Sequence, residues 1–531
     1  MRPLTAVILL SLITVPVFFW NLTDLGLFNT QESIRVNVAR EMQRAGEWVV
    51  PLRRGEGYIA KPPMVYWSQM VLAGARGAVG GDGEVGEFEL RLSAALWGWA
   101  GVMATFFAAR RLLRDLPTKH AALDPAFWSG AALAVGVLSS QSARVGEIDV
   151  MLMAPVATAI MAMHASWMNM LARGKAHWGW IGLAMLAACV AAAVKGPAGL
   201  IVIALGGSVP TLLHGWLSRS AVVLGGKPVS RGVWVFKQFE ATHPVLVLGL
   251  PLVLMWLWLR EARARVGAER FEALVNLEVQ DNLRWFDFSG TDRYVESVLI
   301  ALGVFLVFAA VGGWRVWRDR RVLTPGMWVV ACWFGLGLLA FVLTTKGVGR
   351  YLTPIWPGMA MLAGVGVWTL ASRERYVGRL VAVLVGCVVV QGGVLTWWHA
   401  HARTRAWAER SPREFVREVV ALEGGVSGGV GTLDFVFDAV DFYADMKVEA
   451  WGRHRAARPL EELAARLSES GGAYTLLVVE ENSANRNEEG DPAERLERAG
   501  LRWREVKVGA VHRRPPGDAR VMAWRVWAGE R

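Results

Sequence analysis

The sequence predicts a polytopic α-helical membrane protein with a small α/β domain at its C-terminal end. Three observations support this fold class. Of the 531 residues, 54% are hydrophobic, apolar runs recur up to about residue 398, and the composition becomes polar from about residue 400. Apolar runs of roughly 20 residues are long enough to cross a hydrocarbon core, whereas a soluble protein of this length is rarely so apolar.

The apolar runs predict eleven transmembrane spans, within a range of about 11 to 13. No small-x-small cleavage site follows the first run, so we expect it to remain as a span rather than a removed signal peptide. Residues 64–80 are apolar but short and interrupted by glycine, which favours a helix lying at the membrane interface. The expected spans lie near residues 5–22, 92–113, 125–141, 150–172, 178–194, 198–216, 243–260, 295–313, 326–344, 352–371 and 378–398.

The distribution of basic residues predicts the orientation of these spans. With the N-terminus inside, the interior loops 110–120, 173–175, 217–240, 315–321 and 373–379 hold 17 Lys and Arg residues. The short outer loops 142–149, 195–197 and 345–351 hold four. The positive-inside rule therefore predicts a cytoplasmic N-terminus. The longer outer loop 261–294 is also basic, which counts mildly against this orientation.

Eleven spans place the tail outside the membrane. Residues 1–400 then form the transmembrane domain, with a first outer loop at 23–91, and residues 401–531 form the outer α/β domain. In the tail, a helical stretch at 411–422 precedes GTLDFVF, an acidic helix-like turn, MKVEAW, the helix LEELAARL, the strand TLLVVEE and the alternating VMAWRVW. NSANRNEEGDP, residues 482–492, is typical of a loop.

Composition argues against several classes of function. The three cysteines, Cys189, Cys332 and Cys387, lie inside apolar runs without metal-ligand spacing, so no disulfide or cysteine–metal chemistry is expected. The net charge of +11 reflects basic loops between spans rather than a nucleic-acid surface. His399 and His401 point away from each other on a helix, so we interpret them as structural.

Polar residues that suit catalysis collect on the predicted outer face. In the stretch from residue 28 to 48, Ile34, Val38, Met42 and Ala45 share one helical face, which predicts an interfacial amphipathic helix beginning near Gln31 and Glu32. Glu147 and Asp149 precede a span in the second outer loop. The other outer-face candidates are Lys195 at a span end and, in TTKGVGRYLTP, Lys346, Arg350 and Tyr351.

Each of these residues alone is typical of a capping or snorkelling side chain, but acids and cations recurring on one side favour a functional site. A lipid-linked phosphate needs cations for its charge and an apolar groove for its tail. Glycosyl transfer needs a carboxylate that takes a proton from the acceptor hydroxyl and positive charge that stabilises the leaving phosphate.

An ordered set of motifs strengthens this interpretation. NxxE, AREM, YIAKPP, RLSA, the span-end Asp149, KGP and KGVGRYLTPIWP follow one another along residues 1 to about 400. In this order they resemble the C-type glycosyltransferase superfamily, closest to the aminoarabinose-to-lipid-A transferases and the protein O-mannosyltransferase-like family. The tail resembles the small outer domain of the aminoarabinose-transferase branch. The resemblance implies transfer of a sugar from a polyprenyl-phosphate donor, without a nucleotide sugar, on the outer side of the membrane.

The resemblance also implies roles for individual residues. Asp149 and Lys195 match the family pattern, Lys61 occupies its phosphate-contacting position, and Arg350 stands where many members have His. The family's first-loop Asp-Glu is Gln31-Glu32 here, so that either Glu32 or Asp149 alone serves, or the chemistry has been lost. Ala60 stands where the branch often carries a metal-ligand Glu, so no tightly bound metal is predicted and a divalent cation remains an alternative. The predicted site therefore comprises Asp149, Glu32 and Gln31 for catalysis and Arg35, Lys61, Lys195, Lys346, Arg350 and Tyr351 for donor binding.

The sequence leads to one main hypothesis and two rivals. The first is an envelope glycosyltransferase of a bacterial inner or plasma membrane, whose partners are a polyprenyl-phosphate sugar, membrane lipids and an unknown lipid, glycan or protein acceptor, with the tail domain periplasmic or extracellular. The second, motivated by Gln31 and Ala60, is a catalytically silent protein that binds a lipid-linked sugar or a partner. The third is a transporter or flippase, which lacks support because no paired half-repeats are found.

Overall fold

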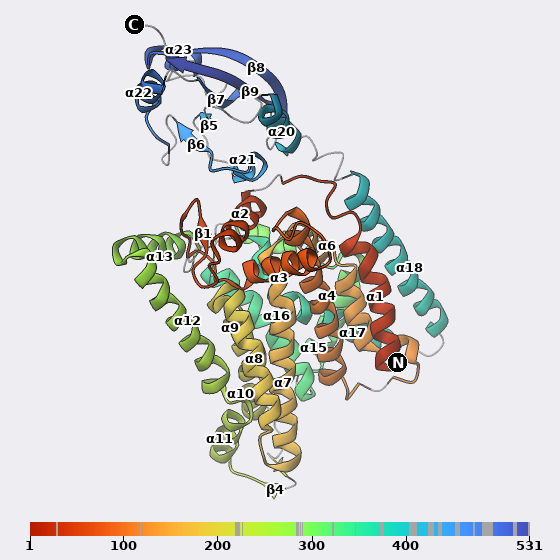
Figure 1. The fold of residues 1–531 in the computed structure, drawn as a ribbon. Coiled ribbons are helices and arrows are strands. Elements are labelled where there is room, and N and C mark those ends of the chain that lie inside the picture. Colours follow the sequence, from red (N-terminus) through yellow and green to blue (C-terminus); the bar gives the residue numbers. More distant parts are fainter. Residues whose placement is uncertain are drawn as a thin grey trace. The chain divides into compact units, whose positions relative to one another are not determined.

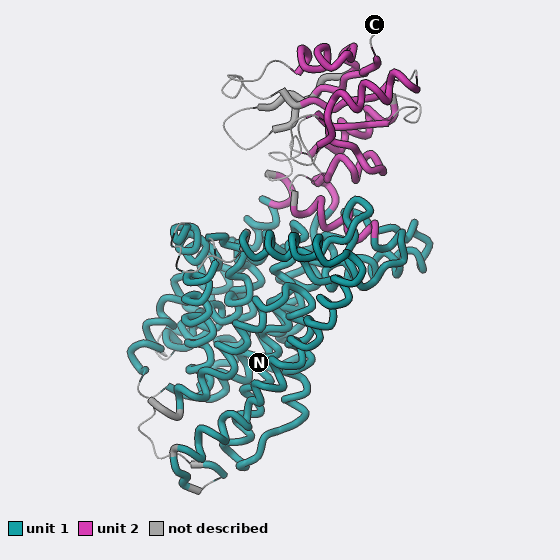
Figure 2. Tube along the Cα trace, turned by 90° about the vertical axis from the view of Figure 1, so that its left-hand side faces the viewer, with its two compact units in different colours: residues 1–22, 42–398 teal, residues 23–41, 399–531 magenta. Residues whose placement is uncertain are grey.

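The protein forms two compact units, each described by itself (Figure 2). Unit 1 comprises Met1–Leu22 and Met42–Trp398, and unit 2 comprises Thr23–Glu41 and His399–Arg531. The structure is a computed structural model. It describes the whole chain except residues 28–29, 117, 218–222, 226, 283–285, 287, 289, 321–322, 346, 372–375, 403–410, 423–428, 434–437, 452–456, 471–472, 481–491, 513–517 and 529–531.

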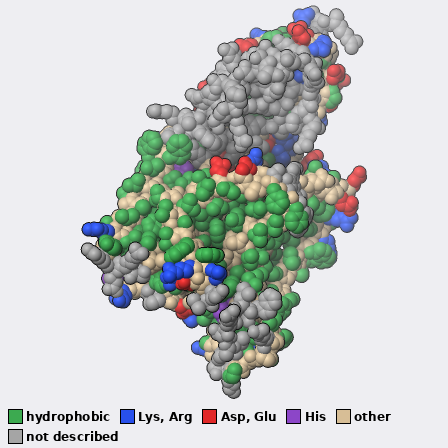
Figure 3. All heavy atoms as spheres, turned by 180° about the vertical axis from the view of Figure 1, so that it is seen from behind, with side chains coloured by type: hydrophobic (Ala, Val, Ile, Leu, Met, Phe, Trp, Pro, Cys, Tyr) green, Lys and Arg blue, Asp and Glu red, His purple; other side chains and the backbone are tan. Residues whose placement is uncertain are grey.

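Unit 1 is a bundle of helices (Figure 1). Hydrophobic side chains cover much of the face of this unit that Figure 3 presents, as expected where lipid is the solvent. Its longer helices are α1 (Pro3–Phe19), α4 (Glu87–Leu112), α7 (Met153–Arg173), α8 (Trp178–Lys195), α12 (Pro244–Val266), α15 (Leu306–Arg318), α16 (Pro325–Thr344), α17 (Trp356–Ala371) and α18 (Val377–Trp397).

Shorter elements connect these helices. They are the hairpins β1 (Leu52–Arg53) with β2 (Glu56–Gly57) and β3 (Val223–Leu224) with β4 (Lys227–Pro228), the α-helices α3 (Met64–Ala78), α5 (Pro125–Ala134), α6 (Val137–Arg144), α9 (Pro197–Ile203), α10 (Val209–Leu217), α11 (Arg231–Thr242), α13 (Ala268–Asn282) and α14 (Thr291–Ile300), and the short helices η1 (Ala121–Leu123), η2 (Ile148–Leu152), η3 (Ala204–Ser208), η4 (Gly303–Phe305) and η5 (Gly349–Ile355).

Within the described residues, eight helices are long and apolar enough to cross a membrane, and a ninth crossing arises if the pair Thr291–Ile300 and Gly303–Arg318, bent by 96°, is one span. The predicted first span forms the shorter apolar helix α1. The predicted interfacial segment 64–80 forms α3. The fold class, a polytopic helical membrane protein with a small C-terminal sheet domain, is therefore confirmed.

The predictions of one continuous span over residues 125–141 and over residues 295–313 are both wrong. The second is broken between Ile300 and Gly303 with a bend of 96°. Helix α5 ends at Ala134, and α6 begins at Val137. The Gln391 side chain of α18 explains how the chain breaks here, because its Nε2 donates to the carbonyl oxygens of Val135 at 2.5 Å and Leu302 at 3.0 Å. Its Oε1 accepts from the backbone N–H of Val304 at 2.8 Å. One buried amide thus satisfies backbone groups at two helix breaks where water is excluded.

Close packing between helices relies on small residues. A Cβ atom at Gly312 of α15 would overlap the carbonyl of Leu362 in α17, and one at Gly366 of α17 would overlap the carbonyl of Phe308. Glycine at both positions lets the two backbones approach closely, as is common between helices in membranes.

Unit 2 contains a five-stranded sheet in the order β6-β5-β7-β9-β8. Strands β5, β6 and β7 pair in parallel, whereas β9 pairs antiparallel with both β7 and β8. Its strands and helices are α2 (Thr30–Ala45, of which residues up to Glu41 belong to this unit), α20 (Arg413–Leu422), β5 (Val430–Leu433), α21 (Asp438–Ala444), β6 (Glu449–Trp451), α22 (Leu460–Ser470), β7 (Ala473–Glu480), α23 (Pro492–Arg498), β8 (Leu501–His512) and β9 (Asp518–Ala528).

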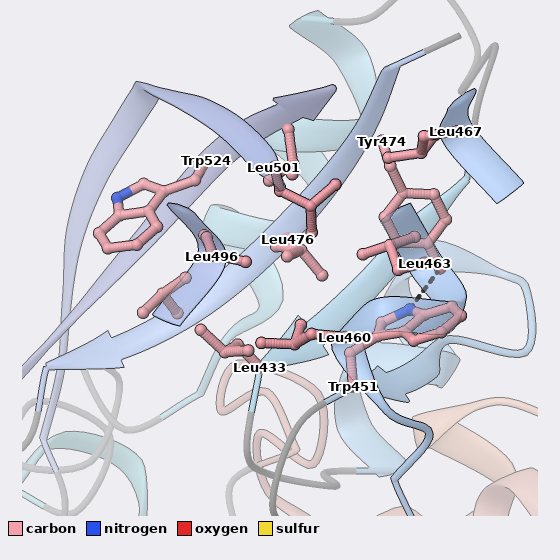
Figure 4. Close-up of a cluster of buried hydrophobic side chains, with 12 residues drawn as sticks. Leu433, Trp451, Leu460, Leu463, Leu467, Tyr474, Leu476, Leu496, Leu501 and Trp524 are labelled. Carbon is pink, nitrogen blue, oxygen red and sulfur yellow. Dashed lines mark hydrogen bonds between the residues drawn. The ribbon is translucent and has the colours of Figure 1, made fainter. Parts of the chain in front are cut away.

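The core of unit 2 lies between one face of this sheet and helices α22 and α23 (Figure 4). Leu460, Leu463 and Leu467 of α22 share one helical face and are buried there. Burial raises the pKa of the Tyr474 phenol, so its hydroxyl stays protonated and donates to the carbonyl of Val430 at 2.9 Å. The tail therefore folds around its own apolar core.

The predicted tail elements form as helices and strands, with two additions. Strand β8 and helix α23 were not predicted. The predicted loop 482–492 lies outside the described residues except for Pro492, which begins α23.

Candidate active site

Asp149 lies almost fully buried, with 1% of its side chain exposed, in the short helix η2 that leads into α7. Glu147 directly precedes η2, at its N-cap position, and is also buried. The polypeptide therefore carries two carboxylates into the interior of unit 1 within three residues, as the sequence predicted for the entrance of this span. A buried carboxylate needs a partner, and the surrounding helices supply cations.

Lys195 is the nearest of these cations. It is the last residue of α8, where Gly196 adopts a positive φ of 62° and ends the helix, and Pro197 begins α9. This Lys-Gly-Pro junction directs the ammonium group at Asp149, whose Oδ1 accepts a hydrogen bond from Lys195 Nζ. Burial of the pair makes the hydrogen bond a fixed part of the site rather than a surface contact.

Arg350 and Tyr351 enter from η5. Arg350 Nε lies 3.8 Å from Asp149 Oδ2, and its NH1 lies 3.9 Å from Glu147 Oε1. Lys195 Nζ lies 4.0 Å from the centre of the Tyr351 ring, a cation–π distance. Asp149 Oδ2 accepts no hydrogen bond within the described part of the chain. One oxygen of Asp149 is thus held by Lys195, and the other faces a guanidinium without a hydrogen bond.

The loop before Arg350 is held against α14 by two glycines. A Cβ at Gly347 would overlap the carbonyl of Gly290, and one at Gly349 would overlap the hydroxyl of Ser297. The hydroxyl groups of Tyr294 and Thr345 form a hydrogen bond of 2.5 Å beside this contact. The GVGR motif therefore fixes the position of Arg350 through close backbone packing.

Lys61 follows the β1–β2 hairpin and pairs with Glu278 of α13. Its Nζ also donates to the carbonyl oxygen of Ala60 at 2.8 Å. Lys61 interacts electrostatically with Lys195, and Glu278 interacts electrostatically with Tyr351. The Lys61–Glu278 pair therefore belongs to the same electrostatic cluster. Glu278 was missed by the sequence analysis, which treated the whole loop 261–294 as a set of basic residues.

An apolar cavity of about 490 Å³ lies between the residues that follow Lys61, helix α8 and helix α12. Pro62 and Pro63, directly after Lys61, form part of its wall, and Ala192 and Ala193 of α8 approach it two to three residues before Lys195. Its other walls come mainly from apolar residues of α12. An apolar space next to a cluster of cations suits a molecule with a charged head and a hydrocarbon tail.

The remaining predicted residues lie elsewhere. Lys346 is outside the described residues. Gln31, Glu32 and Arg35 belong to unit 2, where Arg35 NH2 donates to Gln31 Oε1 at 3.4 Å and Glu32 is fully buried. The groups of His, Cys, Asp and Glu in the described ranges include none that could hold a metal ion, and His399 lies buried in the short helix Trp398–Ala402.

Helix α2 of the first loop is buried on more than the one apolar face that the sequence predicted. Ile34, Val38 and Met42 are buried, as predicted for the apolar face, whereas Ala45 at the end of the helix is exposed. Arg35 and Asn37 are buried as well. Within unit 2, Asn37 Nδ2 donates to the carbonyl of Asp438 at 2.5 Å, so α2 packs against α21 with part of its polar side, while Arg44 near its end is exposed.

Comparison with other sequences assigns neither a family nor a function. No known protein-family profile matches the chain. A curated protein of Aquifex aeolicus (strain VF5), described only as uncharacterized, is 30% identical over 355 residues. The match covers 66% of this chain, which spans about 62% of the length of that relative.

Comparison with solved structures identifies the fold. The crystal structure of ArnT from Cupriavidus metallidurans bound to undecaprenyl phosphate matches with a TM-score of 0.69 and 17% identity over 97% of both chains. The same protein in the apo state gives 0.67 and 18% over 98% of both chains. An oligosaccharyltransferase of Archaeoglobus fulgidus tethered to an acceptor peptide gives 0.50 and 11%, covering 90% of this chain and 69% of that one. The chain therefore shares the fold of these structures, which is the fold that its motifs led us to expect.

Proposed function

We propose that this integral membrane protein transfers a sugar from a polyprenyl-phosphate donor to an acceptor on the outer face of the membrane. The observation that carries the proposal is Asp149, whose Oδ2 accepts no hydrogen bond from the described residues and lies 3.8 Å from Arg350 Nε. The similar ArnT structure was solved with undecaprenyl phosphate, which supports a polyprenyl phosphate as the carrier of the sugar.

In the proposed reaction the donor's hydrocarbon tail occupies the cavity behind Pro62 and Pro63. Arg350 and Lys61, together with Lys346, bind the phosphate, and Lys61 exchanges Glu278 for it. Positive charge here stabilises the phosphate as it leaves, which is the main electrostatic requirement of the reaction.

Asp149 acts as the general base. Its Oδ2 takes the proton of the acceptor hydroxyl as that oxygen attacks the anomeric carbon. The bond from the anomeric carbon to the phosphate oxygen breaks, polyprenyl phosphate leaves with the bonding electrons, and the new glycosidic bond forms with inversion. Lys195 holds Oδ1 so that Oδ2 faces the acceptor, and Glu32 is a further candidate acid in the first loop.

A protein that binds the donor without turning it over is the second candidate. Gln31 stands where the family usually has a carboxylate, and one oxygen of Asp149 is already engaged by a hydrogen bond from the ammonium of Lys195. Both observations favour binding over catalysis, so the test must measure the two separately.

The decisive experiment follows release of polyprenyl phosphate from a panel of polyprenyl-phosphate sugars by the purified full-length protein in detergent. A solubilised envelope fraction supplies acceptors, and donor binding is measured in parallel. Asp149→Asn should lower the rate at least about 100-fold while leaving donor binding within a few-fold. Glu147→Gln serves as a matched control for loss of a nearby carboxylate, and Glu32→Gln tests the first loop.

The outcomes separate the candidates. Release that depends on Asp149 supports the transferase, and the responding sugar identifies the donor. Binding without release by the wild type supports the silent binder. Neither binding nor release of any donor, by a folded protein, would remove polyprenyl-phosphate sugars from the proposal.

A further inference from the structure

A second hollow lies in unit 2, far along the chain from the transmembrane site. It is a groove of about 1110 Å³ between α22, the end of α23, and the β8–β9 pair, all labelled in Figure 1. β8 is an edge strand of the sheet. Arg502 and Trp503 point to opposite faces of β8 because successive strand residues alternate, and both line the groove. The groove therefore wraps around the first residues of this edge strand.

Small residues create the hollow on its helical side. Ala464 and Ala465 line the groove between Glu461 and Glu469 on the exposed face of α22. The opposite face of α22 packs its leucines, among them Leu463, into the core shown in Figure 4. Because alanine side chains end at Cβ, they leave space above the helix surface that longer side chains would fill.

The groove offers two kinds of binding group. Trp503 stacks on Trp524 of the core with ring centres 4.3 Å apart, so Trp503 is held rigidly while it lines the groove. Trp527 of β9 is half-buried and lines the groove from the other face of the sheet, because it pairs with Arg502 whereas Trp503 pairs with Val526. Aromatic rings held in this way provide apolar faces with little conformational entropy to lose on binding.

The second kind is carboxylate. Glu461, Glu469 and Glu497 line the groove, and no group in the described part of the chain forms an ion pair or hydrogen bond with their carboxylates. Their neighbours behave differently, because Glu462 pairs with Arg458 and Glu494 with Arg498. With Arg502 as the one cation among the lining residues, the groove has two more negative than positive charges.

We propose that this groove binds a glycan that contains amino sugars. The flat apolar faces of pyranose rings pack against the indoles of Trp503 and Trp527, and the carboxylates accept hydrogen bonds from hydroxyl and ammonium groups. The volume is at the upper end of ligand sites, which commonly measure about 300–1,000 Å³, so the groove accommodates more than one sugar ring. Charge complementarity selects a cationic glycan over an acidic one. The inference does not depend on the transferase reaction, because it concerns binding at unit 2 alone.

The test measures binding of a tetramer of β-1,4-linked glucosamine, labelled at its reducing end, to the full-length protein in detergent micelles. The N-acetylated tetramer and tetralysine serve as comparison ligands. We expect the glucosamine tetramer to bind at least tenfold more tightly than either. Trp527→Ala should weaken that binding at least tenfold, as should the double variant Glu461→Gln/Glu469→Gln.

Two controls accompany this binding measurement. Glu505→Gln removes an exposed carboxylate of β8 that does not line the groove and should leave binding unchanged. Each variant is checked for an unchanged melting temperature and elution volume. If Trp527→Ala does not fold, the double glutamine variant, which changes only exposed side chains, decides the result.

Three outcomes overturn the proposal. Equal affinity for tetralysine shows charge attraction or peptide binding rather than glycan recognition. Equal affinity for the N-acetylated tetramer removes the requirement for amino groups. Unchanged binding in a folded double variant places the ligand outside this groove.

Discussion

At the scale of single residues, the contact between Lys195 and Asp149 combines stability with function. Asp149 is buried and depends on Lys195 for the hydrogen bond to Oδ1, while Arg350 approaches only to 3.8 Å. Removing one partner of a buried pair leaves an uncompensated charge, whereas removing both does not. The two residues should therefore be strongly coupled in a double-mutant cycle.

Lys195→Met is expected to lower the free energy of unfolding by about 3–5 kcal/mol. The double variant Lys195→Met/Asp149→Asn should recover at least half of that loss, because no charge remains unpaired. Denaturant unfolding in detergent measures both. Equal stability of the single and double variants would show that Asp149 finds another partner or is neutral in the wild type.

Glu278 supplies a second prediction at this scale. It pairs with Lys61, the cation expected to contact the donor phosphate. A bound phosphate and Glu278 compete for the same ammonium, so Glu278→Gln should tighten donor binding several-fold. The salt dependence of donor binding should fall less in this variant than in a variant that removes the charge of Lys61.

The matched control for this change is Glu272→Gln on the same helix α13, where Glu272 pairs with the exposed Arg263. That variant should leave donor affinity unchanged, as expected for a surface ion pair. Weaker donor binding in Glu278→Gln would instead mean that Glu278 orients Lys61 for the phosphate.

At the scale of elements, the helix breaks depend on Gln391. Replacing it with leucine removes three hydrogen bonds and leaves the carbonyls of Val135 and Leu302 and the N–H of Val304 unsatisfied in an apolar environment. We expect Gln391→Leu to destabilise the protein by about 1–3 kcal/mol, the cost of leaving such groups unpaired. Donor release per folded molecule should remain within a few-fold of wild type, since Gln391 is not part of the proposed site.

Val390→Leu, at an exposed position on the same helix, controls for changes in α18 itself. It should not alter unfolding. If Gln391→Leu is as stable as this control, other groups satisfy the two breaks.

The helix breaks also show which features of an element a sequence can predict. Apolar length predicted the helix-forming runs, but the interruption at residues 135–136 contains no proline, and its hydrogen-bond partner lies 256 residues away in α18. In the same way, the apolar face of α2 was readable from its period, whereas the burial of Asn37 depends on α21, about 400 residues later. Local patterns report local periodicity, and they do not report partners distant in sequence.

The candidate site follows the same division. Asp149, Lys195, Arg350 and Tyr351 could be predicted, because charges next to apolar runs are costly and because their motifs resemble a family. The contacts between these residues could not be predicted. Glu278 could not be predicted either, because α13 carries no motif and Glu278 takes part only through its ion pair with Lys61. A search for carboxylates in outer-loop helices would have included Glu278 among the candidates.

At the scale of the whole molecule, the charge asymmetry between loops predicts a definite topology. The interior loops hold 17 Lys and Arg residues and the short outer loops hold four, and this asymmetry between short loops determines how spans insert. We therefore expect Asp82 in the first loop and Glu505 in unit 2 to lie outside, and Thr118 and Arg318 to lie in the cytoplasm. All four positions are exposed in the structure.

Single cysteines at these four positions test the topology in a background where Cys189, Cys332 and Cys387 are replaced by alanine. A membrane-impermeant maleimide applied to intact cells or spheroplasts should label positions 82 and 505. Positions 118 and 318 should react only after the membrane is permeabilised. Labelling of position 505 together with position 118 would mean that an even number of spans separates the N-terminus from unit 2. The proposed base Asp149 and the unit 2 groove would then lie on opposite sides of the membrane. That result would remove an outer-face reaction from consideration.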